Sequence, residues 1–113
     1  PRGSGKAWVG GGAMALYLVV HTPVDPDNIT VMAPTRMLDL ARDAGTEGAS
    51  PRWLKTWSPD LHDDRIFSLW EAEDAAEIGQ ILDRYGFLSH MSAQPLRVQE
   101  WGPADVIAAE GAR

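Results

Sequence analysis

Three kinds of residue in this chain could do chemistry: histidines, a carboxylate next to an aromatic strand, and several tryptophans. His21 ends the apolar segment "ALYLVVHT", and His90 lies in "LSHM". Each imidazole could move a proton near neutral pH or bind a divalent metal ion. Glu71 follows Trp70, and a carboxylate at the edge of an apolar cavity could act as a general base. His21, Glu71 and His90 are therefore candidate catalytic residues, and His21 and His90 are also candidate metal ligands.

Each of these residues also has a structural explanation. His21 could be a strand-end histidine whose ring bonds to a backbone carbonyl, and His90 could pack where a helix meets a strand. Glu71 could cap the following helix or pair with Arg65 or Lys55 at the surface. The sequence leaves both interpretations open for all three residues.

The tryptophans are the most unusual feature of the composition. The chain has 5 of them in 113 residues. Aromatic side chains supply large contact areas both at subunit interfaces and in pockets for flat ligands. Simple alternation along "RWLKTWS" predicts Trp53, Lys55 and Trp57 on one face of a strand. The candidate ligand-binding residues are Tyr17, His21, Trp53, Trp57 and Trp70, with a dimer core as the alternative explanation.

The apolar periodicity predicts how these residues are positioned. Helical spacing, with a proline near the start and a glycine at the end, favours a helix over 34–45. A second helix is predicted to begin with the capping pair Asp74 and Glu77 and to end at Gly86. The tail after residue 101 reads as a short helix or a frayed end. Strands are predicted over 15–22, 52–58, 65–71 and 95–101.

The predicted order β-α-β-β-α-β indicates an α+β, ferredoxin-like fold, with a four-stranded antiparallel sheet and two helices on one face. The strand "RIFSLWE" is apolar on both sides, with Phe67 and Leu69 on one face and Ile66 and Trp70 on the other. Helices cover only one of these faces. An open apolar face of this size indicates an interface. We therefore expect a homodimer that packs sheet against sheet, with a cavity beneath each sheet.

Composition excludes several classes of protein. The formal charge of −6 gives no electrostatic footprint for nucleic acid or for an anionic membrane. The absence of cysteine excludes disulfides and thiolate chemistry, and no apolar run approaches the roughly 20 residues that span a bilayer. We expect a cytoplasmic protein. Residues 1–13 read as an expression-tag or linker remnant, and 14–113 as a single domain.

The element order and the segment "RWLKTWSPDLHDDRIFSLWEAEDAAEI" resemble the dimeric α+β barrel superfamily. Within it, the chain most resembles small uncharacterised proteins that include a nickel-binding protein. The shared pattern is a Trp-Leu strand, an acidic hairpin, and a strand that runs into "WEAED". The resemblance covers residues 15–101. It implies a homodimer and a possible divalent metal such as nickel, although Lys55 stands where those relatives would have a histidine.

Three functional hypotheses follow. The first is a homodimer that binds a small molecule or a metal ion in an aromatic-lined cavity. The second, implied by other members of the superfamily, is a cofactor-independent monooxygenase or isomerase acting on an aromatic or polyketide-like substrate. A cavity of about 300 Å³ or more with an imidazole or carboxylate in its wall would favour this enzyme. The third is an interaction module that has no ligand.

Overall fold

The computed structural model describes residues 14–24, 35–60 and 62–111. The elements are β1 (Ala15–His21), α1 (Met37–Ala44), β2 (Arg52–Trp57), β3 (Ile66–Ala72), α2 (Ala75–Arg84), the 3-10 turn η2 (Phe87–Ser89), β4 (Gln94–Val98) and α3 (Pro103–Gly111). This succession confirms the predicted order of elements through β4. The four strands form one antiparallel sheet in the order β2-β3-β1-β4, which is consistent with the ferredoxin-like arrangement.

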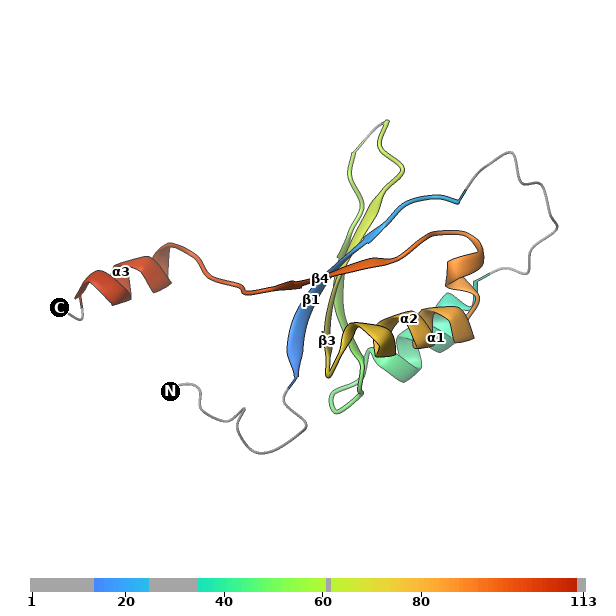
Figure 1. The fold of residues 1–113 in the computed structure, drawn as a ribbon, viewed down its shortest axis with the longest axis horizontal. Helices are drawn as coiled ribbons and strands as arrows, with labels where there is room; N and C mark the ends of the chain where they lie inside the picture. Colours follow the sequence, from blue (N-terminus) through green and yellow to red (C-terminus); the bar gives the residue numbers. More distant parts are fainter. Residues whose placement is uncertain (1–13, 25–34, 61, 112–113) are drawn as a thin grey trace.

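The helices lie on both sides of the sheet plane (Figure 1). α1 and α2 cover one face, as predicted, and their apolar sides form the core with that face. α3 projects on the opposite side, away from the body of the molecule, and none of its residues is buried. The sheet therefore has a helix-covered face and an open face.

Strand register decides which side chains lie on each face. Tyr17 pairs with Trp70, and Val19 pairs with Ser68, so these four residues point toward the helices. Val19 is 0% exposed and Trp70 is 1% exposed. Alternation of side chains places the residues between them on the open face. That face carries Leu16, Leu18, Val20, Phe67, Leu69, Leu96 and Val98.

One prediction about β2 is wrong. Simple alternation placed Trp53 and Trp57 on the same face, but the pairing of β2 with β3 shifts between Trp53 and Lys55. A β-bulge of this kind leaves one residue unpaired and exchanges the faces of the residues that follow. Trp53 therefore pairs with Trp70 on the helix-covered face. Lys55 and Trp57 lie on the open face, where the Lys55 ammonium is 5.9 Å from the Trp57 ring centre.

The helix signals were mostly right, and the boundaries were less accurate. Asp74 caps α2 by accepting a hydrogen bond from the Glu77 backbone N–H at 3.0 Å. Gly86 follows the helix with a φ of 81°, which glycine adopts without strain. α1 begins at Met37, and the predicted start at Pro34 lies outside the described residues. The last strand ends at Val98, three residues before the predicted end, at Trp101.

No helix in the described part of the chain is long and apolar enough to cross a membrane.

Candidate functional site

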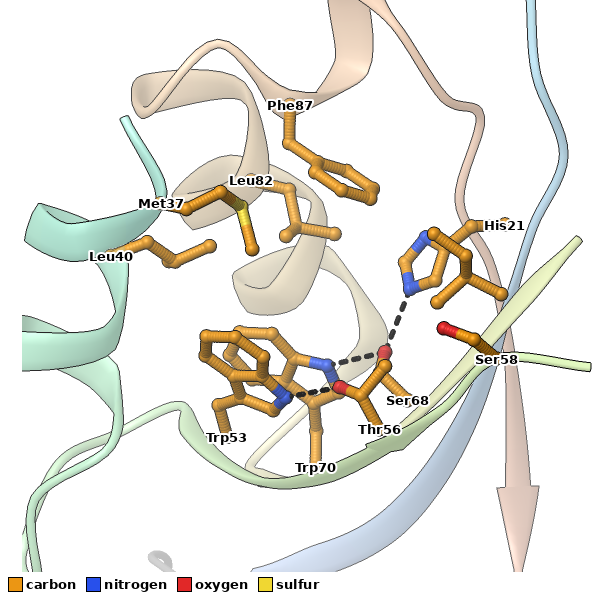
Figure 2. Close-up of a pocket in the computed structure, with 11 residues that line it drawn as sticks. His21, Met37, Leu40, Trp53, Thr56, Ser58, Ser68, Trp70, Leu82 and Phe87 are labelled. Atoms are coloured by element: carbon orange, nitrogen blue, oxygen red, sulfur yellow. Dashed lines mark hydrogen bonds between the residues drawn. The ribbon is translucent and has the colours of Figure 1, made fainter. Parts of the chain in front are cut away.

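A cavity of about 230 Å³ lies between the sheet and the helices (Figure 2). One side is apolar and comes from α1, α2 and η2, which contribute Met37, Leu40, Leu82 and Phe87. Leu40 and Leu82 are held there by the helical spacing that also builds the core. The cavity is smaller than the 300 Å³ expected for the enzyme, so it suits a ligand of one or two rings.

Two tryptophans from neighbouring strands form an aromatic wall. Trp53 and Trp70 are cross-strand partners, and their rings stack with centres 6.1 Å apart and planes 13° apart. The bulge in β2 makes this pair possible because it turns Trp53 toward the helices. Stacked, nearly parallel rings present flat apolar surface, which favours a planar ligand.

The sheet side of the cavity adds a small polar group to its apolar residues Trp53, Ile66 and Trp70. Four side chains, from β1, β2, β3 and the residue after β2, bring hydroxyl or imidazole groups together there (Figure 2). Thr56 Oγ1 accepts a hydrogen bond of 2.7 Å from Trp53 Nε1–H, and this bond fixes the orientation of the indole. The four residues are His21, Thr56, Ser58 and Ser68.

A hydrogen-bonded chain runs through His21 and Ser68. His21 Nδ1 lies 3.0 Å from the Ser92 carbonyl oxygen, and His21 Nε2 lies 2.7 Å from Ser68 Oγ. Trp70 Nε1–H donates to the same Ser68 oxygen at 2.8 Å. A carbonyl can only accept, so Nδ1 carries the proton and Nε2 accepts from the Ser68 hydroxyl. The donor and the acceptor are therefore defined for each hydrogen bond that involves His21 or Ser68 Oγ.

The surroundings of His21 favour its neutral form. The side chain is 2% exposed, and the edge of its ring meets Phe87 at 4.8 Å between ring centres. Burial lowers the pKa of His21 below 6.5, and the bond to the Ser92 carbonyl opposes this shift more weakly. Among the described residues that line the cavity, no other is an acid, a base or a second histidine. The imidazole is therefore a neutral base at neutral pH.

The structure brings together only some of the predicted site residues. His21, Trp53 and Trp70 line the cavity. Tyr17 is in the core beside it, 7% exposed, and Trp57 is on the open face, 46% exposed. The predicted ligand-binding set is therefore divided between the two faces of the sheet.

The other two catalytic candidates lie elsewhere. Glu71 is on the open face, where it pairs with Arg52 across the strands at 3.9 Å rather than with Arg65 or Lys55. His90 caps the C-terminal end of η2 and is not part of the cavity lining. Of the three, only His21 reaches the cavity.

Sequence reasoning missed Ser68 and Thr56. Both are single hydroxyl residues inside strands, and serine or threonine alone is too common to be a signal. Ser68 is a polar residue in an otherwise apolar strand and shares a face with His21 once β1 and β3 pair. A polar position between Phe67 and Leu69 was the available clue.

Metal binding has no support in the described part of the chain. No group of three or more histidine, aspartate or glutamate side chains there lies close enough to hold an ion. Both ring nitrogens of His21 also have hydrogen-bond partners. The nickel expectation stays a prediction.

Comparisons with protein-family models, with curated proteins and with solved structures found no match for this chain. The function is therefore inferred from the geometry of the site itself.

Proposed function

We propose that this protein binds a small, flat, largely apolar molecule in the cavity between its sheet and its helices. The observation that carries the proposal is the stacked pair Trp53 and Trp70 beside the polar group of His21 and Ser68. Pockets that recognise small molecules combine apolar walls with a few convergent polar groups, and this cavity has both. The ligand class that fits is an aromatic molecule of one or two rings with one oxygen substituent.

The dimeric α+β barrel belongs to the same proposal. The open face carries Leu16, Leu18, Leu69 and Leu96, and Leu96 is 46% exposed. α3 extends on that side of the sheet and exposes Ile107. A helix of 9 residues is marginal in water by itself, so it too needs a surface to pack on. A second copy of the chain, packed sheet to sheet, would cover both the open face and α3.

The enzymatic hypothesis is the second candidate: the cavity of about 230 Å³ is smaller than the volume that would favour an enzyme, but a neutral base lies in its wall. His21 could take a proton from an aromatic substrate through Ser68. Its bond to the serine hydroxyl at 2.7 Å is the observation that favours this.

Calorimetric titration with 2-naphthol tests the binding proposal. We expect one site per chain with a Kd of about 10–100 μM, a value reasonable for a ligand of this size. Ser58→Trp should weaken binding by about tenfold or more because it fills the rim of the cavity. Ser89→Trp is the matched control, since Ser89 is exposed and lies outside the lining. Equal binding by both variants, or no binding by the wild type, would contradict the proposal.

A further inference from the structure

Ser68 and His21 have the arrangement of a nucleophile and its base. The hydroxyl donates to a neutral imidazole, and a backbone carbonyl orients that imidazole through its other nitrogen. Serine nucleophiles are activated in this way by an adjacent general base, which is itself held by a third group. In this chain the Ser92 carbonyl occupies the place of the third group.

We propose that Ser68 is a nucleophile for acyl transfer from small aryl esters, with His21 as its general base. The proposal rests on the binding function above, because the apolar cavity would hold the aryl group of the ester. Ser68 lines the cavity and is 4% exposed, and in this proposal the carbonyl carbon of a bound ester sits against its oxygen.

The reaction balances without a cofactor. Ser68 Oγ forms a bond to the ester carbonyl carbon while its proton moves to His21 Nε2. The tetrahedral intermediate collapses, the bond from carbon to the aryl oxygen breaks, and that oxygen takes the proton from Nε2. Water then repeats the sequence on the acyl-serine, releasing the carboxylic acid and restoring the hydroxyl.

A second hydrogen bond holds the Ser68 oxygen in place. Trp70 Nε1–H donates to Ser68 Oγ at 2.8 Å while the Ser68 hydroxyl donates to His21 Nε2. This pair of bonds fixes the direction from which the oxygen meets a bound ester. The negative charge of the tetrahedral intermediate would form on the ester's carbonyl oxygen, and Thr56, the cross-strand partner of Ser68 on the same face, lies on that part of the cavity wall.

The protonation state supports the same role. Burial lowers the pKa of His21, so the ring is neutral and able to accept the serine proton at pH 7. Among the described residues, the groups that bond to or stack on this imidazole belong to Ser68 from β3, Ser92 before β4 and Phe87 from η2, and none of these three is charged.

The test is intact-protein mass spectrometry after mixing with 2-naphthyl acetate, followed by peptide mapping. We expect one acetyl group per chain, located on Ser68, formed together with a burst of 2-naphthol. Ser68→Ala should remove this label, His21→Gln should slow labelling by about 100-fold or more, and Ser89→Ala should label like the wild type. Titration of Ser68→Ala with 2-naphthol shows whether that variant still folds and binds.

Two results would overturn the inference. One is acetylation confined to exposed lysines such as Lys55, and the other is wild-type labelling no faster than that of His21→Gln. Binding of 2-naphthol without acetylation of Ser68 would leave the binding function intact and remove only the nucleophile. If 2-naphthol does not bind and Ser68 is not acetylated, both the binding function and the nucleophile are ruled out.

Discussion

The hydroxyl of Ser68 and the imidazole of His21 meet because of strand register. Val19 lies opposite Ser68 and Ile66 lies opposite His21, so the two polar residues are diagonal neighbours on one face. Diagonal side chains on paired strands are close enough to interact. His21 could be singled out from the sequence because of its residue type. Ser68 could not, because its partner is 47 residues away and only the pairing brings them together.

The bonds of Ser68 should also contribute to stability. In Ser68→Ala, the buried Trp70 N–H and the His21 Nε2 both lose their partner. An unsatisfied buried polar group costs about 1–3 kcal/mol, so we expect a loss of that order in the free energy of unfolding. Urea unfolding measures it, with Ser89→Ala as control, because Ser89 is exposed and lies outside the cavity lining. A loss no greater than that of the control would show that the chain of hydrogen bonds is weak.

The lowered pKa of His21 has a consequence for stability against pH. Because the folded pKa lies below 6.5, the unfolded chain binds more protons just below that pH. The neutral His21 therefore makes its full contribution to the free energy of unfolding above about pH 6.5, and this contribution decreases as the pH falls. Urea unfolding between about pH 8 and pH 5 should show a steeper loss in the wild type than in His21→Gln. Parallel curves would mean that the pKa is not lowered.

At the level of elements, periodicity and capping signals predicted the order of the elements, and they predicted the boundaries less accurately. The helix beginning at Asp74 carries its own start and stop signals, so local chemistry was sufficient there. The bulge in β2 was not predicted, although "RWLKTW" has two adjacent apolar residues, Trp53 and Leu54, followed by two adjacent polar ones. Only pairing with β3 shows that Leu54 is passed over and that Trp53 and Trp57 point to opposite faces.

Gly79 lies in the interior of α2 and gives a prediction about that helix. A methyl group added there would meet nothing within 4 Å. Glycine in a helix interior is less favourable than alanine by about 0.5–1 kcal/mol, so Gly79→Ala should stabilise the protein by that amount. Thermal unfolding measures the gain. A lower melting temperature would indicate that another surface packs closely on this part of α2.

At the scale of the whole molecule, the two faces of the sheet have separate roles in the proposed account. The helix-covered face builds the cavity, and the open face packs against a second copy. The sequence predicted that both faces are apolar. It did not show which face carries the cavity, because that depends on the side of the sheet on which α1 and α2 pack.

The dimer can be tested by placing a charge on the open face. Leu96 pairs with Leu18 and is 46% exposed, so Leu96→Asp should leave the fold of one chain intact. Two such carboxylates in an apolar sheet-to-sheet interface would be buried without partners. Sedimentation analysis should show a wild-type dimer and a Leu96→Asp monomer. Leu38→Asp, which changes an exposed residue of α1, should stay dimeric; a monomeric wild type would contradict the assembly.

The most direct test of the binding site is a titration with 2-naphthol followed by the indole N–H signals in nitrogen-15 NMR spectra. Trp53 and Trp70 line the cavity, whereas Trp57 and Trp101 do not. We predict that the signals of Trp53 and Trp70 shift in a saturable way while those of Trp57 and Trp101 stay in place. Shifts confined to Trp57 and Trp101 would place the ligand on the open face and contradict the central claim.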